Sequence, residues 1–379
     1  MNPRTHLQPA RRATPLRLAG IVTALALGGA LTGCAAANEN PNAGGDATNA
    51  SGPTLSGTLN GAGSSAQEAA MAAWQAGFQQ AHPDVTVNYD PVGSGGGREQ
   101  FIAGGIAFAG SDAYLSEDEL AGATKRCSGQ APIEIPDYVS PIAVIYQLDG
   151  VEELQLSPAT LAGIFAGDIT SWDDPAIAAN NPDAQLPAQR IVPVHRADDS
   201  GTTENFTDYL AQSAPDAWPH GASGLWPVKS GEAAQGTSGV VAAVQNGAGT
   251  IGYADESQDG DLSVASVKVG EEYVAPSAEA AATVLEVSPR VEGRADTDMA
   301  VELDRGTTAS GAYPIVLTSY LIACPTYPDA QTAALVQGFL AHVVGDQGQQ
   351  AAAQSAGSAP LPDDLQREAL SHIDAISAG

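Results

Sequence analysis

Basic side chains are scarce in this sequence. Its 379 residues include 15 Lys and Arg against 44 Asp and Glu, which gives a formal net charge of −29 at pH 7. A surface of that sign repels nucleic acid and anionic lipid head groups, so we predict no nucleic-acid partner. An anion could bind only through local donors that work against the field of the whole protein. We expect the acidic excess mainly to keep the protein soluble outside the cell.

Aromatic residues are also few, at 5% of the chain, whereas the apolar fraction of 43% is ordinary for a globular protein. Small residues are abundant, with 42 Gly among them. Cores built mainly from small and aliphatic side chains are therefore expected. The chain is too long for one compact core and long enough for two lobes.

Several patterns of enzyme and cofactor chemistry are missing. No Gly-rich turn is followed by the Lys of a P-loop, and no ribose-binding acid accompanies the Gly-rich turns. Neither a His-Glu-x-x-His pattern nor paired Cys and His spacing suggests zinc. Ser200 lacks the Gly of a nucleophile elbow, because Asp198 stands two residues before it. His195 would point to the opposite side of its strand from Arg196. We predict no catalytic residues, no cofactor and no metal.

The N-terminus has the pattern of an export signal. Four Arg precede an apolar run over residues 18–31, which is typical of a signal peptide spanning 1–33. The Leu-Thr-Gly-Cys sequence ending at Cys34 resembles the bacterial lipobox, which implies lipidation of Cys34 and attachment to the extracytoplasmic face of the cell membrane. A membrane helix from Leu18 is the alternative, but a span needs about 20 residues. Removal of the four Arg would leave a net charge of −33.

Residues 34–53 are rich in Ala, Asn and Gly and have no periodicity, so we expect a flexible tether. Apart from Cys34, the chain has two cysteines, Cys127 and Cys324. An even pair in an exported protein favours a disulfide, with two separate buried thiols as the alternative.

One local unit, a strand followed by a Gly, Ser and Thr turn and then a helix, occurs three times. The strand, turn and helix fall at 55–60, 61–65 and 67–80, then at 85–89, 93–97 and 98–103, and then at 190–194, 196–203 and 204–211. Such alternation predicts α/β layers with largely parallel sheets, in which ligands bind beyond the carboxyl ends of the strands. Helix N-termini supply N–H donors and the positive end of the helix dipole, which favours an anion.

The remaining expected elements are assigned from apolar periodicity. The strands are expected at 106–110, 141–148, 224–228, 250–253 and 312–322, and the helices at 154–165, 237–245, 278–285, 331–344 and 363–377. Ser200 is expected to cap the helix that follows it. Asp173 and Asp174 are expected to be helix caps or part of a solvated turn and not metal ligands.

Each Gly-rich turn alone would more often serve only to reverse the chain. Together with other segments, however, they resemble the phosphate-binding proteins of bacterial high-affinity phosphate ABC transporters, in the order of that family. The matching segments are 61–65, 93–96, 108–112, 161–165, 169–177, 196–202 and 249–253. The Trp-Asp-Asp-Pro-Ala-Ile sequence at 172–177 and the Arg-Ala-Asp-Asp-Ser-Gly-Thr sequence at 196–202 are the most specific of these.

The resemblance implies an α/β, two-lobed periplasmic-binding-protein fold of type II. Each lobe would be a mostly parallel sheet flanked by helices. Lobe I would comprise residues 54–141 and 313–379, and lobe II residues 142–312, with hinge crossings near Ser140 and Tyr313. Closure of the lobes would bury the ligand between them.

The family's ligand positions can be carried over one by one. The implied phosphate ligands are Ser65, Ala66 through its N–H, Ser94, Asp112, Arg196, Ser200, Gly201 and Thr202. Asp198 would hold the guanidinium of Arg196 in place. This chain departs from many members in having Ala66 instead of a large aromatic residue. It also has Asp199 where Gly is common, which adds a negative charge close to the site.

The implied function is capture of inorganic phosphate and delivery to the membrane permease subunits of the transporter, by a monomer. Phosphate keeps a proton at neutral pH, so Asp112 can accept a hydrogen bond from it. Sulfate has no proton, and a buried carboxylate left unpaired costs several kcal/mol. Other oxyanions such as sulfate or molybdate, and a phosphatase or serine hydrolase, are the alternatives for function. A helix N-cap before Tyr114 is the alternative for Asp112.

Overall fold

The computed structural model describes residues 55–379. The predicted signal peptide at 1–33, the lipidated Cys34 and the tether at 34–53 lie outside the described residues. Within residues 55–379, no helix combines the length and apolar character that a membrane crossing requires.

The strands form a large sheet in which the order β2-β1-β3-β11-β4-β8-β6-β7 is continuous, with β9 attached to β4 and carrying β5 and β10. A separate pair joins β12 and β13. The strands are β1 (Gly57–Gly63), β2 (Val85–Asp90), β3 (Phe108–Ser111), β4 (Ile133–Gln147), β5 (Gln155–Leu156), β6 (Val192–Arg196), β7 (Glu232–Ala234), β8 (Thr250–Asp255), β9 (Ser263–Val269), β10 (Glu272–Val274), β11 (Val316–Ala323), β12 (Thr326–Tyr327) and β13 (Ser377–Ala378).

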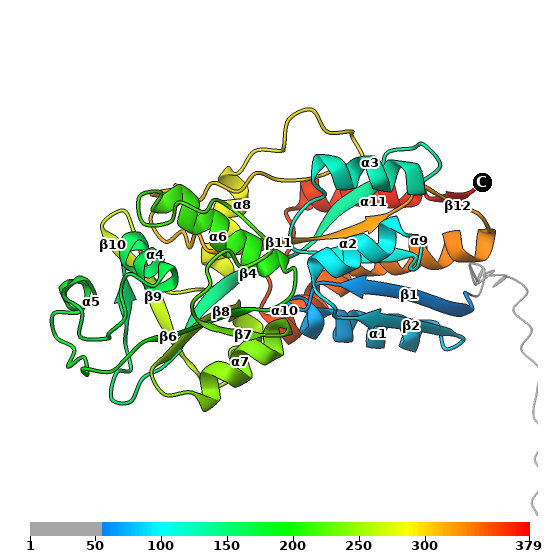
Figure 1. Cartoon of the computed structure of the whole chain (residues 1–379). Helices are drawn as coiled ribbons and strands as arrows, with labels where there is room; N and C mark the ends of the chain where they lie inside the picture. Colours follow the sequence, from blue (N-terminus) through cyan, green and yellow to red (C-terminus); the bar gives the residue numbers. More distant parts are fainter. Residues whose placement is uncertain (1–54) are drawn as a thin grey trace, which may run out of the picture. The chain divides into compact units, whose positions relative to one another are not determined.

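The long strand β4 lies in the middle of the strand order and runs through both parts of the sheet (Figure 1). Residues 133–141 pair with β11, and residues 142–147 pair with β8. We call β1, β2, β3, β11 and residues 133–141 the first sheet half. The second sheet half contains residues 142–147 together with β5 to β10. The blue strands β1 and β2 lie at one end of β4 in Figure 1, and β6 and β9 at the other.

The sheet is mixed, so the prediction of mostly parallel sheets is wrong, although the α/β class is confirmed. The pairs β1–β2, β1–β3, β6–β7 and β6–β8 are parallel. By contrast, β11 is antiparallel to both β3 and β4, and β4 is antiparallel to β8. The reason is topological: β4 takes the chain from the first half to the second, and β11 returns it, so the two must run in opposite directions.

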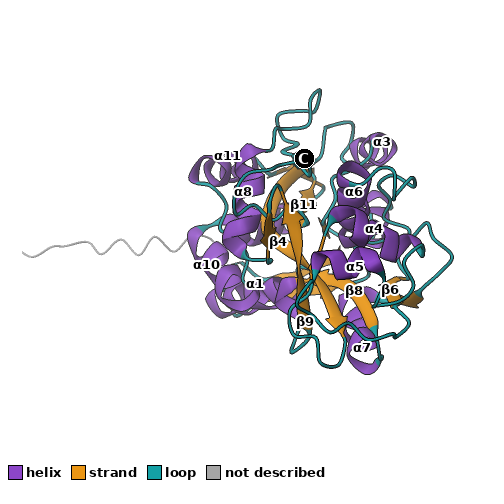
Figure 2. Ribbon diagram, turned by 90° about the vertical axis from the view of Figure 1, so that its left-hand side faces the viewer, coloured by secondary structure: helices purple, strands orange, loops and turns teal. Residues whose placement is uncertain are grey.

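Helices cover both faces of the sheet (Figure 2). They are α1 (Glu68–Ala81), α2 (Ser94–Ile102), α3 (Glu117–Arg126), α4 (Pro158–Ala166), α5 (Pro175–Asn180), α6 (Gly201–Ser213), α7 (Gly236–Asn246), the 3₁₀ turn η1 (Glu256–Gln258), α8 (Ala278–Val287), α9 (Ala330–Val344), α10 (Asp346–Ala356) and α11 (Asp363–Asp374). As the spacing predicts, α1 buries Met71, Trp74 and Phe78 on one face.

Two predicted caps are confirmed. Ser200 precedes α6, and its Oγ accepts a hydrogen bond from Thr203 N at 3.2 Å. Asp174 caps α5 through a bond from Ala176 N at 2.8 Å. Helix α2 begins at Ser94, four residues earlier than expected, because the Gly residues of the predicted turn continue into the helix. Gly93 before it has a φ of 95°, which favours glycine.

Some elements differ from the prediction. Residues 224–228 form no strand, and β7 begins only at Glu232. Pro227 cannot donate to a strand ladder, and Leu225, two residues before it, is 61% exposed. Helices α3 and α10 were not predicted because their sequences are mainly polar or small, so the apolar periodicity that marks a helix is weak in them.

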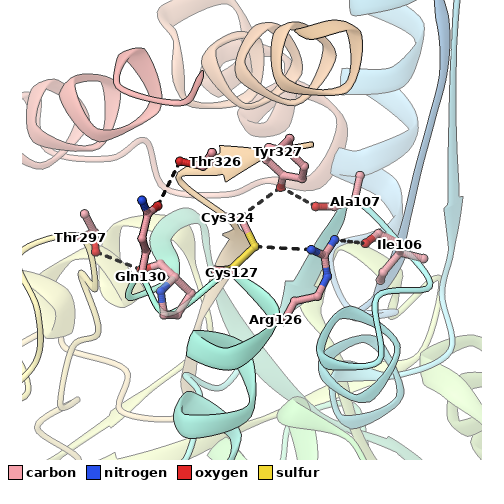
Figure 3. Close-up of a disulfide and its surroundings, with 10 residues drawn as sticks. Ile106, Ala107, Arg126, Cys127, Gln130, Thr297, Cys324, Thr326 and Tyr327 are labelled. Carbon is pink, nitrogen blue, oxygen red and sulfur yellow. Dashed lines mark hydrogen bonds between the residues drawn. A yellow bond between two sulfur atoms is a disulfide. The ribbon is translucent and has the colours of Figure 1, made fainter. Parts of the chain in front are cut away.

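The predicted disulfide is present between Cys127 at the end of α3 and Cys324 just after β11, 197 positions apart (Figure 3). Both residues are buried. The hydroxyl of Tyr327 lies beside the bond, where it accepts from Cys324 N at 3.1 Å and donates to Ala107 O at 2.6 Å. The bridge therefore closes a long loop within a well-packed part of the first sheet half.

Replacing both Cys127 and Cys324 by Ser should lower the free energy of unfolding by about 2–5 kcal/mol, because the unfolded chain regains the freedom that the long loop loses. Urea unfolding of the variant and the unreduced parent protein would measure this. Equal midpoints, or two free thiols in the denatured parent protein, would contradict it.

A buried carboxyl lies at the end of β8. Asp255 is fully buried, and its Oδ1 accepts from Tyr138 Oη at 2.9 Å and from Ser257 N at 3.1 Å. Burial raises the pKa of Asp255 from 3.8 to about 7, against the opposing effect of these hydrogen bonds. Between pH 3.8 and about 7, Asp255 is therefore protonated in the folded protein and ionised in the unfolded chain. This contribution to stability is complete below pH 3.8 and is lost as the pH rises through about 7.

The substitution Asp255→Asn keeps an acceptor oxygen and removes the titration. We expect the variant to be more stable than the parent protein at pH 8, and the difference to shrink as the pH falls toward 4. Thermal unfolding across this pH range tests the expectation. Parallel profiles for the two proteins would show that Asp255 does not hold the proton.

Candidate anion-binding site

Turns from both sheet halves meet at the carboxyl ends of β3 and β6. Ser94 begins α2, Asp112 follows β3, and Gly201 begins α6 in the second half. A Cβ atom placed on Gly201 would lie 2.6 Å from Ser94 Oγ and 2.8 Å from the Cβ of Asp112. Only glycine permits this approach, so the residue type at position 201 is required for the two halves to meet as they do.

The carboxylate of Asp112 lies at the centre of this contact and is 2% exposed. Its Oδ2 accepts from Thr202 Oγ1 at 3.1 Å and from Ser94 Oγ at 3.4 Å. Its Oδ1 accepts from Ser319 Oγ at 2.7 Å. Hydroxyls of α2, α6 and β11 thus surround it. Asp112 is not a helix N-cap, because the next helix, α3, is capped by Ser116.

Arg196, the last residue of β6, is 3% exposed and held by Asp198. Its Nε donates to Asp198 Oδ1 at 2.8 Å, and its Nη2 donates to Oδ2. Asp198 also accepts from Gly236 N at 3.1 Å. Burial alone would raise the pKa of Asp198, but the hydrogen bonds and charge of Arg196 bring it below its ordinary value. The guanidinium is therefore fixed, and much of its charge is balanced locally.

Ser65, in the turn after β1, faces the start of α7. Its Oγ lies 3.0 Å from Thr237 Oγ1 and accepts from Thr237 N at 3.2 Å. Nη1 of Arg196 donates to Thr237 Oγ1 at 3.5 Å, so this hydroxyl links two of the predicted ligands. The N–H of Ala66, which the resemblance assigns to the anion, donates to Ser64 Oγ at 3.0 Å.

The structure thus gathers the predicted residues into one buried group. Ser65, Ser94, Asp112, Arg196, Asp198, Ser200, Gly201 and Thr202 all come from the turns that end strands or begin helices around this contact. Asp199 lies beside it, and its main-chain oxygen accepts from Gly95 N at 3.2 Å.

Three residues of this group were not predicted. Thr237 could have been found, because the Gly-Thr-Ser-Gly sequence at 236–239 opens a helix after a short strand. Ser319 is one of three hydroxyl-bearing residues in the buried, mainly apolar strand β11, which is a weak signal. Asn205, which donates to Asp112 O at 2.7 Å, carries no signal beyond its place in a helix.

His195 does not join Ser200 as a catalytic pair. Its ring stacks on Trp226, with the centroids 4.9 Å apart, and its Nδ1 lies 2.9 Å from Arg196 O. Burial lowers the pKa of His195. Among residues 55–379, no three His, Cys, Asp or Glu side chains are grouped to hold a metal ion.

This group of residues has the donors and the acceptor needed to bind a small anion through hydrogen bonds. Hydroxyls, one locally balanced guanidinium and the N-termini of α2, α6 and α7 are donors, and they add little formal charge. One buried carboxylate, Asp112, is an acceptor. Its two oxygens have about four lone pairs, of which the three hydroxyl contacts use part. Such a site can accept a hydrogen bond from the anion as well as donate hydrogen bonds to it.

Comparison with known proteins gives a family match over most of the chain. Residues 48–347 match the model of the PBP superfamily domain. The sequence is 37% identical to phosphate-binding protein PstS 3 of Mycobacterium tuberculosis over 371 residues, which cover 94% of this chain and 98% of that protein. It is 35% identical to PstS 2 of the same organism over 327 residues, covering 84% of this chain and 87% of that protein.

Among solved structures, the fold is similar to that of the high-affinity periplasmic phosphate-binding protein PfluDING, determined with phosphate bound. The TM-score is 0.68, the sequence identity is 24%, and the match covers 82% of this chain and 92% of that one. At this identity the likeness concerns the fold, and it agrees with a mixed sheet flanked by helices.

Proposed function

This chain belongs to the PstS family of phosphate-binding proteins in the PBP superfamily, and we propose that it captures inorganic phosphate for import by a phosphate ABC transporter. The family is one of transport proteins and not of enzymes. The single observation that carries the ligand assignment is the buried Asp112 carboxylate, held by hydroxyls from both sheet halves.

In the proposed complex, phosphate accepts hydrogen bonds from the side chains and helix N-termini of this group. The donors are the hydroxyls of Ser65, Ser94, Ser200 and Thr202, the guanidinium of Arg196 and the N–H groups of Gly201 and Ala66. For Ala66 this requires its N–H to turn from Ser64 Oγ, its partner here. The hydroxyls of Ser94 and Thr202 each have one hydrogen, so each must turn from Asp112 Oδ2 to donate to phosphate. Asp198 fixes the orientation of the Arg196 guanidinium, and its carboxylate balances the positive charge of that group.

Asp112 is proposed to select phosphate over sulfate. Its carboxylate can accept a hydrogen bond from the protonated oxygen of phosphate. Sulfate has no such hydrogen and would bring only lone pairs to a buried negative charge. An unpaired buried charge costs several kcal/mol, which corresponds to roughly a thousandfold in affinity. Discrimination then comes from a repulsive contact with the wrong anion as much as from an attractive contact with the right one.

The two sheet halves are proposed to be the two lobes of the binding protein. Lobe I would contain residues 54–141 and 313–379, and lobe II residues 142–312. The crossings near Ser140 and Tyr313 fall where β4 passes between the halves and where the chain enters β11. One segment departs from these bounds: Thr297 O accepts from Glu134 N at 2.9 Å, so this part of the 142–312 range lies along β4 in the first half.

The N-terminal segment is proposed to place the protein at the outer face of the cell membrane, through a lipid on Cys34 and a tether over residues 34–53. Membrane permease subunits of the transporter would receive phosphate from the closed protein, which would act as a monomer.

A thermal-shift panel of phosphate, sulfate and molybdate tests the proposed ligand. At equal concentrations phosphate should raise the midpoint most, because a ligand that binds only the folded state stabilises it more the more tightly it binds. A larger shift with sulfate or molybdate would assign the other oxyanion instead. Turnover of a chromogenic phosphate ester would indicate a hydrolase.

Asp112→Asn should weaken phosphate binding and reduce the difference in affinity between phosphate and sulfate, because an amide can also donate a hydrogen bond to an unprotonated oxygen. Calorimetric titration of the variant with each anion at neutral pH measures the two affinities. Undiminished discrimination in this variant would remove Asp112 from the selective role.

Gly201→Ala should lower phosphate affinity at least tenfold, because the new methyl group would overlap Ser94 Oγ and the Cβ of Asp112 and hold the halves apart. The matched control is Gly105→Ala, an exposed position without a positive φ, where the nearest atom to the new Cβ would be Gln100 O at 3.5 Å. Titration of both variants, with their thermal midpoints, separates lost closure from lost folding. Wild-type affinity in Gly201→Ala would show that the close approach is not needed.

A further inference from the structure

The side-chain amide of Asn205 joins the two sheet halves without being one of the predicted ligands. Its Nδ2 donates to Asp112 O at 2.7 Å and to Gly201 O at 2.9 Å. Its Oδ1 accepts from Nη2 of Arg305. A carbonyl only accepts and a guanidinium only donates, so the orientation of the amide is unambiguous.

Arg305 is itself firmly placed. It is 2% exposed, and its Nε donates to Asp208 Oδ2 at 3.1 Å. Its Nη1 donates to Pro314 O at 2.9 Å and to Val316 O at 2.5 Å, where the chain enters β11. Asn205 is thus aligned by a buried cation that is also bonded beside the proposed hinge.

A second amide makes the equivalent connection across the other side of the site. Gln258 lies in η1, directly after β8 of the second half. Its Nε2 donates to Ser65 O at 2.9 Å and to Ala66 O at 2.7 Å, in the turn after β1 of the first half. Each amide therefore reaches main-chain carbonyls of a turn that carries proposed phosphate ligands.

We propose that Asn205 and Gln258, the two bridging amides, hold the ligand-bearing turns of the first half against the second half and so set the rate of phosphate release. This inference rests on the proposed phosphate-binding function. Both amides donate to main-chain oxygens of the first half from elements of the second half, so these contacts exist only while the halves are together. They stabilise the closed form, and their loss should speed opening and leave the encounter with phosphate unchanged.

The first test is to replace each amide by Ala. Asn205→Ala and Gln258→Ala should each raise the dissociation rate of phosphate about three- to tenfold, the range expected for one or two lost hydrogen bonds. Asn205 borders a cavity of about 150 Å³, together with Asp112 and Arg305, so truncation would enlarge a space that no neighbour fills. Radiolabelled phosphate bound to each variant, chased with unlabelled phosphate, gives the rate.

The substitution Asn205→Asp separates positioning from general structural support. An aspartate keeps the volume and can pair with Arg305, so thermal stability should be retained. It loses the donor and sets a carboxylate oxygen against Asp112 O and Gly201 O, so phosphate release should be faster than in Asn205→Ala. Release slower than in the Ala variant would contradict the proposal.

The control is Asn246→Ala. Asn246 is an exposed residue of α7 whose Nδ2 donates to Ala242 O of the same helix, and its loss should leave the release rate unchanged. Unchanged release in the folded Asn205 and Gln258 variants, with wild-type protein that does bind phosphate, would overturn the role of the bridging amides alone. Failure of the wild-type protein to bind phosphate would instead overturn the proposed function.

Discussion

The carboxylate of Asp112 is a negative charge, nearly fully buried, in a protein that already carries a net charge of −29. It is held there by the hydroxyls of Ser94 and Ser319 from the first sheet half and Thr202 from the second. A buried carboxylate with fewer donors would be strongly unfavourable. The two halves must therefore approach closely, which in turn requires Gly201 at the start of α6. The rest of the site follows from this constraint.

The same constraint explains how an acidic protein can bind an anion. Adding cations would be one route, but Arg196 is the single cation placed in the group described above, and Asp198 balances it. The other donors are hydroxyls and helix N-termini, which act at short range and change the net charge little. Such a site works by geometry more than by long-range attraction. It therefore depends on contacts that keep its turns in place, of which the bridging amides Asn205 and Gln258 are the clearest.

The sequence predicts the local parts of this structure well. The units of strand, Gly-rich turn and helix, the caps at Ser200 and Asp174, and the pairing of Cys127 with Cys324 were all predicted, because each depends on residues close in sequence or on a simple count. The mixed sheet was not, because strand direction depends on how β4 and β11 pass between the halves. Ser319, Asn205 and Gln258 were missed for a related reason: their partners lie 207, 93 and about 190 positions away. Nothing local marks them.

The most direct test of the central claim is a crystal structure of the protein with phosphate bound. The account predicts one anion between the halves, in contact with Arg196 and the start of α6, with one of its oxygens within hydrogen-bond distance of the Asp112 carboxylate. Phosphate bound by one half alone, or bound in the cleft with Asp112 turned away from it, would contradict the account.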